Sequence, residues 1–138
     1  ISRGLVGSEM CIRDRYTIAK YGMSLCVLGM AEEFKEQGVA VNALWPRTAI
    51  ATAAVQNVLG GDEMSKISRT PEIMADAAHV ILTKNSNEFS GNFCIDDNLL
   101  AENGVKDFSQ YASVPFAELA PDFFVPEDIP APEEAKNS

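Results

Sequence analysis

The longest helical pattern in the chain runs from Tyr16 to Gln37. Apolar and small residues recur in it at steps of three or four positions, which is the spacing of one face of an α-helix. These positions are Ile18, Gly22, Leu25, Cys26, Gly29 and Met30. Val27, Ala31 and Phe34 widen the apolar side, so we expect the helix to be buried on more than one side. Gly38 follows the charged end of the helix and is a typical helix stop.

Two short apolar runs predict β-strands. The run Val39–Leu44 fits a strand of a parallel sheet that is buried on both faces. Trp45-Pro46 ends this strand, because proline cannot donate a hydrogen bond to a sheet. The second run, 89–95, predicts another strand, and the paired acids Asp96-Asp97 mark its end.

Further helices are predicted between and after the strands. A loop from Arg47 leads into a helical segment that ends at Leu59, and a short helical or irregular piece covers 64–69. Thr70-Pro71-Glu72 is a helix start, because threonine is a good N-cap and proline suits the first turn. This helix is predicted to run to about Thr83, and a short helix is expected around 99–103. The predicted buried face of the helix from Glu72 to Thr83 consists of Ile73, Met74, Ala77, Ala78, Ile81 and Leu82.

The order of these elements is helix, strand, helix, helix, strand, which is typical of an α/β fold. Two parallel strands need neighbouring strands and helical cover, so we interpret the chain as the C-terminal part of a doubly wound parallel sheet that is truncated at its N-terminus. Residues 1–15 show no apolar period and are interpreted as a non-native leader. Residues 16–125 form the predicted domain part, and 126–138 are a predicted disordered, acidic and proline-rich tail or linker.

Composition and charge narrow the classes of function. The 138 residues carry a net charge of −9, which makes nucleic acid an unexpected partner. No apolar run is long enough for a membrane span. The three cysteines show no disulfide or metal-site spacing and indicate a reducing compartment, and the sequence contains no recognisable set of metal ligands.

The candidate chemistry lies at Tyr16 and Lys20. On a helix, residues four positions apart lie on one face, so the phenol and the ammonium group are expected to be neighbours. A nearby positive charge favours the phenolate and lowers the pKa of a tyrosine, which suits proton transfer at neutral pH. An exposed tyrosine beside a solvated lysine explains the same spacing, and the spacing alone leaves both interpretations open.

An ordered set of motifs resolves this choice. It consists of Tyr16-xxx-Lys20 on a long helix, the strand with Val41-Asn42-Ala43, then Pro46 and Thr48, and finally Ser90-Gly91 leading a strand that ends at Asp96. In this order and with these separations, the set resembles the C-terminal half of the short-chain dehydrogenase/reductase domain. Residues 16–125 are accordingly assigned to that half-domain. The sequence departs from the family at Arg47, where glycine is usual, and a side chain there would change the loop or reach a cofactor phosphate.

The resemblance implies a role for each matching residue. Tyr16 is the general acid/base and also contacts the cofactor, and Lys20 stabilises the Tyr16 phenolate and binds the nicotinamide ribose. Pro46, Thr48 and Ile50 lie against the nicotinamide, and residues 49–69 occupy the position of the substrate lid. The glycine-rich phosphate turn and the catalytic serine of the family have no counterpart in this sequence.

The resemblance also implies an activity for an intact parent protein. This is an oxidoreductase that uses NADP(H), with NAD(H) not excluded, and acts on a small apolar or lipid-like alcohol or ketone. We expect the parent to be a homo-oligomer, intracellular and peroxisomal or mitochondrial, and the 138-residue chain alone to be inactive. The alternatives are a dehydratase or epimerase of related type, and a non-catalytic scaffold beside a lipid-binding domain.

Overall fold

The computed structural model describes residues 8–58, 61–126 and 128–138. The chain divides into two compact units, which are described separately below. The first consists of residues 1–43 and 86–92, and the second of residues 44–85 and 93–138.

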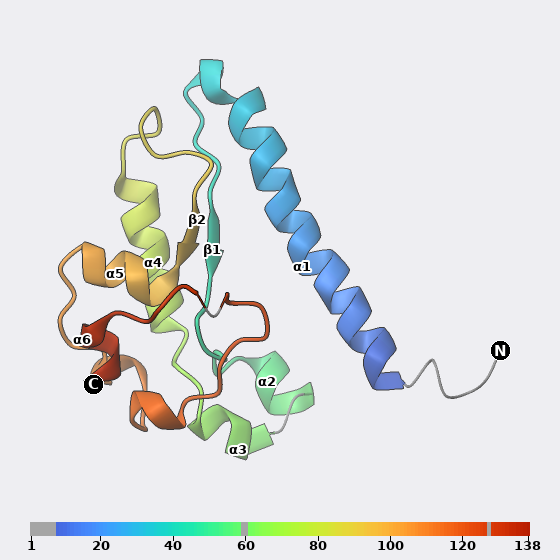
Figure 1. Ribbon diagram of the computed structural model, residues 1–138, viewed down its shortest axis with the longest axis vertical. Helices are drawn as coiled ribbons and strands as arrows, with labels where there is room; N and C mark the ends of the chain where they lie inside the picture. Colours follow the sequence, from blue (N-terminus) through green and yellow to red (C-terminus); the bar gives the residue numbers. More distant parts are fainter. Residues whose placement is uncertain (1–7, 59–60, 127) are drawn as a thin grey trace. The chain divides into compact units, whose positions relative to one another are not determined.

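The first unit is dominated by helix α1, Ser8–Glu33 (Figure 1). The helix begins eight positions before the predicted start at Tyr16. Residues 8–15 lack an apolar period, but glutamate, methionine and arginine among them favour helix by propensity and extend it. At the other end the helix tightens into the 3₁₀ turn η1, Lys35–Gln37. The predicted stop at Gly38 is confirmed, because Gly38 has a left-handed φ of 68° and donates its amide to the carbonyl of Lys35 at 3.1 Å.

The expectation that this helix is buried on more than one side is wrong for the described chain. Ser24 and Val27 are buried, whereas Ile18 is 73% exposed, Leu25 67% and Leu28 56%. The sequence predicts an apolar face on α1, but the described residues bury only a small part of that face.

Strands β1, Ala43–Trp45, and β2, Phe93–Ile95, form a two-stranded parallel sheet (Figure 1). Both strands begin later than the sequence predicts. Before them, side chains take over hydrogen bonds that a regular sheet would form between backbones: Ser90 Oγ accepts the amide of Val41 at 3.0 Å, and Asn42 Oδ1 accepts the amide of Asn92 at 3.0 Å. Strand β1 is half-buried rather than buried on both faces, because β2 is its one neighbour in the described sheet.

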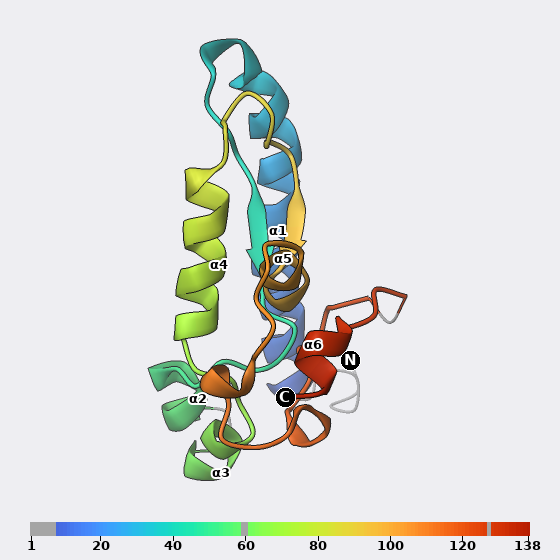
Figure 2. The ribbon, with the colours of Figure 1, turned by 90° about the vertical axis from the view of Figure 1, so that its left-hand side faces the viewer.

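The remaining helices belong to the second unit. They are α2 Ala53–Val58, α3 Gly61–Lys66, α4 Glu72–Thr83, α5 Asp96–Glu102, η2 Ser109–Tyr111, η3 Phe116–Glu118 and α6 Glu133–Lys136. The predicted end of the helical segment after Arg47, Leu59, lies outside the described residues. Figures 1 and 2 both show α4 running beside the β1–β2 pair. Among the described residues, no helix is long and apolar enough to cross a membrane.

The core of the second unit forms where α4 and α5 meet. Ile73 and Ala77 of α4 and Leu99 and Leu100 of α5 are buried. The predicted bounds of α4 are confirmed, and Pro71 already has helical backbone angles of −60° and −19°. The predicted inward position of Leu82 is wrong, since this residue is 83% exposed in the last turn of the helix.

The C-terminal segment is partly ordered, contrary to the disorder predicted from its composition. Ala135 of α6 is completely buried and, together with Phe108, Phe116 and Leu119, lines a small hollow. The sequence suggested disorder because acidic residues and prolines surround this single alanine, which leaves no apolar period to recognise.

Candidate functional site

Tyr16 and Lys20 lie next to each other on α1, as their spacing predicts. The Lys20 Nζ atom is 5.4 Å from the centre of the Tyr16 ring. Tyr16 as a residue is 44% exposed. This arrangement places a cation beside a phenol within one turn of helix, and the catalytic roles of the two residues remain a prediction.

The other predicted contacts, Pro46, Thr48 and Ile50, lie in the second unit on the loop that follows β1. We call residues 46–51 the post-strand loop. Its backbone is tied on two sides. Ala49 donates its amide to the carbonyl of Ala120 at 2.8 Å, and Ala51 donates to the carbonyl of Arg69 at 2.8 Å. Isolated bridges at Thr48 and Ile50 belong to these two pairings.

Two amides of the post-strand loop have no partner among the described residues, those of Thr48 and Ile50. The Thr48 residue is 3% exposed. A buried backbone N–H group without a partner is costly, and ligand binding is one way to satisfy it. These two amides belong to two of the three residues that were predicted to contact the cofactor.

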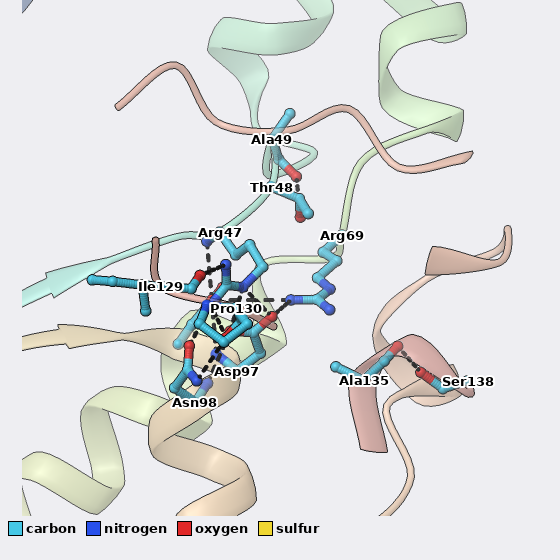
Figure 3. Close-up of polar contacts among 11 residues, drawn as sticks. Arg47, Thr48, Ala49, Arg69, Asp97, Asn98, Ile129, Pro130, Ala135 and Ser138 are labelled. Atoms are coloured by element: carbon cyan, nitrogen blue, oxygen red, sulfur yellow. Dashed lines mark hydrogen bonds and ion pairs between the residues drawn. The ribbon is translucent and has the colours of Figure 1, made fainter. Parts of the chain in front are cut away.

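Arg47 lies in the middle of this loop, and its side chain points into the protein (Figure 3). The residue is 8% exposed, and its Nε atom lies 2.8 Å from both carboxylate oxygens of Asp97. The sequence allowed an arginine that reaches a cofactor phosphate or one that changes the loop. The observed contacts favour the second interpretation, because the guanidinium group is used inside the unit.

A buried group of charges surrounds Arg47. Asp96 and Asp97 are completely buried, and Arg69 is 1% exposed, with its Nη1 atom 3.1 Å from Asp97 Oδ2 and 3.9 Å from Asp96 Oδ1. Figure 3 shows Arg69 reaching toward Asp97 from a different part of the chain than Arg47. Two arginines thus lie beside two aspartates. The attraction between these opposite charges offsets part of the free-energy cost of burying them.

The two oxygens of Asp96 have different surroundings. Oδ1 accepts the amides of Arg47 at 3.0 Å and Asp97 at 2.8 Å, whereas Oδ2 is buried with no hydrogen-bond partner among the described residues. Burial and then the charge of Asp97 raise the pKa of Asp96 to about 6, against the opposing effects of the Arg47 amide and the Arg69 charge.

Sequence reasoning assigned Asp96-Asp97 to a strand end, which is right, but missed their burial beside two arginines. The available signal was weak. It consisted of two acids directly after an apolar strand, together with an arginine where the resembling family has glycine.

The structure brings the predicted site residues together in two groups. Tyr16 and Lys20 are neighbours in the first unit, and Pro46, Thr48 and Ile50 share one loop in the second. The described residues contain no group of three or more histidine, cysteine or acidic side chains that could hold a metal ion.

Comparison with known proteins finds relatives that are named as dehydrogenases, in line with the resemblance of the motifs. The chain is 58% identical over 112 residues to hydroxysteroid dehydrogenase-like protein 2 of Xenopus laevis, which is 81% of this chain and 26% of that protein. It is 56% identical over 123 residues to the protein of the same name from Rattus norvegicus, covering 89% of this chain and 23% of the relative. The chain thus spans about a quarter of the length of the curated relatives it matches.

Solved structures agree with the curated relatives. A dehydrogenase from Xanthomonas campestris superimposes with a TM-score of 0.72 at 54% identity, over 81% of this chain and 40% of that one. A short chain dehydrogenase from Mycobacterium thermoresistibile gives a TM-score of 0.71 at 53% identity, over 83% and 41%. No protein-family model matches the chain. The predicted α/β architecture, part of a Rossmann-type dehydrogenase fold, is confirmed.

Proposed function

From this similarity to short-chain dehydrogenases we propose that the chain supplies the acid/base pair and the nicotinamide-facing loop of an oxidoreductase. The proposed reaction is hydride transfer between NADP(H) and an alcohol or ketone, carried out by a longer protein of which this chain is a part. The observation that carries the proposal is the Tyr16–Lys20 pair, whose 5.4 Å separation and exposed position suit proton transfer.

Each residue has a distinct proposed task. When bound, a nicotinamide cofactor would supply the hydride to a carbonyl carbon or would accept it from an alcohol. The Tyr16 hydroxyl donates a proton to the carbonyl oxygen in the first direction and receives it in the other, and the Lys20 ammonium stabilises the phenolate left behind. The amides of Thr48 and Ile50, beside Pro46, would donate hydrogen bonds to the nicotinamide carboxamide and would help to orient the ring.

The proposed substrate has an apolar, lipid-like body. Ala53 and Ala54 are exposed on α2, in the segment that follows the post-strand loop, and Val55 of the same helix is buried. Apolar surface close to a few polar groups is typical of small-molecule sites. For the longer protein we also propose a homo-oligomer and a peroxisomal or mitochondrial location. We further propose NADP(H) as the preferred cofactor.

The test is a steady-state assay of the full-length protein with NADPH and a panel of ketones that differ in apolar chain length. Tyr16→Phe removes the transferable proton and should lower kcat by roughly 10²- to 10⁴-fold, far more than it weakens the binding of NADPH. Tyr21→Phe is the matched control, because Tyr21 is an equally exposed tyrosine on the same helix and should retain activity.

The other outcomes separate the alternatives. Equal activity of Tyr16→Phe and the unmodified protein would contradict the proposed role of Tyr16. Product formation without net consumption of NADPH would favour a dehydratase or epimerase. Absence of turnover with every substrate and either nicotinamide cofactor, in a folded protein, would favour a non-catalytic scaffold.

A further inference from the structure

We infer that Arg47 is a positioning residue for the post-strand loop, and that the C-terminal segment 128–138 completes its anchorage. The inference rests on the proposed function, in which this loop orients the nicotinamide. Arg47 does not touch the cofactor in this account. It acts by holding the backbone that carries Thr48 and Ile50.

The guanidinium of Arg47 uses all three of its nitrogen atoms inside the unit. Nε contacts both oxygens of Asp97 at 2.8 Å. Nη1 donates to the carbonyl of Ile129 at 3.0 Å, and Nη2 donates to the carbonyl of Pro130 at 3.3 Å and to Asn98 Oδ1. Figure 3 shows these partners converging on one side chain. A planar group with several fixed donors can serve them together, which a lysine ammonium on its flexible stem cannot.

The backbone of Arg47 is fixed by the same surroundings. Its amide donates to Asp96 Oδ1 at 3.0 Å, and its carbonyl accepts the amide of Asp122 at 2.9 Å. One residue therefore joins the post-strand loop to the start of α5, to the 120–122 segment and to the C-terminal segment. Because Thr48 follows Arg47 directly, any shift of Arg47 moves the first of the two open amides.

The C-terminal segment is held independently of Arg47. Ala135 is completely buried, the Phe116 amide donates to the carbonyl of Ser138 at 3.4 Å, and Lys106 pairs with Glu134 at 2.8 Å on the surface. These contacts hold the carbonyls of Ile129 and Pro130 within hydrogen-bonding distance of the Arg47 guanidinium group. The segment is thus a clasp that belongs to the second unit. Its removal would leave Nη1 of Arg47 without its acceptor and Nη2 with Asn98 Oδ1 alone.

The test compares two ligands of the full-length protein. One is NADPH, and the other is 2′-phospho-ADP-ribose, which has the same phosphates and adenosine but no nicotinamide. Arg47→Met removes the charge and can prevent folding, because it leaves Asp97 buried with one cation fewer. Arg47→Lys keeps the charge and loses the planar donors, so it serves as the second variant. Deletion of residues 128–138 removes the clasp, and Lys106→Met is the control that breaks only the exposed pair with Glu134.

We expect Arg47→Lys and the deletion to weaken NADPH binding by roughly tenfold, with little change for 2′-phospho-ADP-ribose and little change for Lys106→Met in either ligand. Equal weakening of both ligands would overturn the inference, because it would show a general structural role. Unchanged binding of both ligands by Arg47→Lys would overturn it as well.

Hydrogen exchange at the amides of Ala49 and Ala51 separates this inference from the proposed function. Both amides are bonded in the post-strand loop, and they should exchange faster in Arg47→Lys and in the deletion than in Lys106→Met. An unmodified protein that binds neither ligand would overturn the proposed function, and the exchange rates would then decide whether Arg47 positions the loop. Unchanged exchange rates would overturn the positioning role itself.

Discussion

Asp96 is a carboxyl group under opposing influences. Two backbone amides and the nearby Arg69 favour its ionised form, whereas complete burial and the neighbouring Asp97 favour the protonated form. Burial and the charge of Asp97 outweigh the two amides and Arg69, so the pKa of Asp96 rises from 3.8 to about 6. A proton on the otherwise unpartnered Oδ2 would remove a buried charge, which gives this residue a measurable dependence on pH.

The first prediction concerns Asp96→Asn. Because the folded pKa of about 6 exceeds the reference value of 3.8, the folded state binds more protons between these values, and the stability contributed below pH 4 is lost as pH rises through 6. That loss is at most roughly 3 kcal/mol. The asparagine side chain cannot ionise, so the free energy of unfolding of Asp96→Asn relative to the unmodified chain should increase from pH 4 to pH 7. Urea unfolding of both proteins at several pH values measures this difference in the free energy of unfolding. Any effect of the asparagine that does not depend on pH shifts all the values equally and leaves the trend unchanged.

Asp107→Asn provides the control for this experiment. Asp107 is exposed, and hydrogen bonds from Ser109 lower its pKa, so its contribution changes with pH in the opposite direction. A difference for Asp96→Asn that stays flat from pH 4 to pH 7 would show that Asp96 titrates normally in the folded chain.

At the scale of single residues, the sequence predicts contacts that are local and misses those that are not. Tyr16 and Lys20 are neighbours because helix geometry alone brings them together. The partners of Arg47 lie 50 positions away at Asp97 and 82 positions away at Ile129. No local pattern specifies such contacts, and an arginine and two aspartates in one sequence usually indicate solvated charges.

Among the elements, α4 is the one whose sequence and structure agree best. Its start is marked by Thr70-Pro71-Glu72, and its apolar period gives Ile73 and Ala77 the inward positions that they occupy. Helix α1 has an apolar period of the same kind, but most of its apolar side chains are exposed. An apolar period therefore predicts that a helix forms and which face is apolar, and it does not show what covers that face.

The second prediction compares a completely buried and a highly exposed apolar residue of α4. Ile73→Ala removes a completely buried side chain and should lower the free energy of unfolding by about 2 to 5 kcal/mol, through lost burial and the cavity left behind. Leu82→Ala, at an 83% exposed position of the same helix, should change it by no more than about 0.5 kcal/mol. Urea unfolding of both variants measures the contrast, and similar losses at the two sites would mean that Leu82 is covered in solution.

At the scale of the whole molecule, the alternation of helices and strands was enough to predict part of a doubly wound α/β fold. The relation to dehydrogenases came from the resemblance of the ordered motifs between Tyr16 and Asp96. The segment 126–138 was predicted to be a tail or linker. In the structure it is held by one buried alanine and by backbone carbonyls that accept hydrogen bonds from Arg47. Backbone acceptors leave no trace in a sequence, so this part of the architecture could not be predicted.

The last prediction concerns nucleotide binding by the 138-residue chain alone. The chain contains the acid/base pair and the post-strand loop, but none of its glycines forms the Gly-x-Gly-x-x-Gly turn whose backbone binds a pyrophosphate. Most of the cofactor is phosphate and adenosine, which two amides of one loop cannot hold. We therefore expect no saturable binding of NADPH in the micromolar range by the isolated chain, and clear binding by the full-length protein. Energy transfer from tryptophan to bound NADPH measures both, and in the 138-residue chain it can come only from Trp45. Low-micromolar binding by the isolated chain would show that the phosphates are held by residues not identified above.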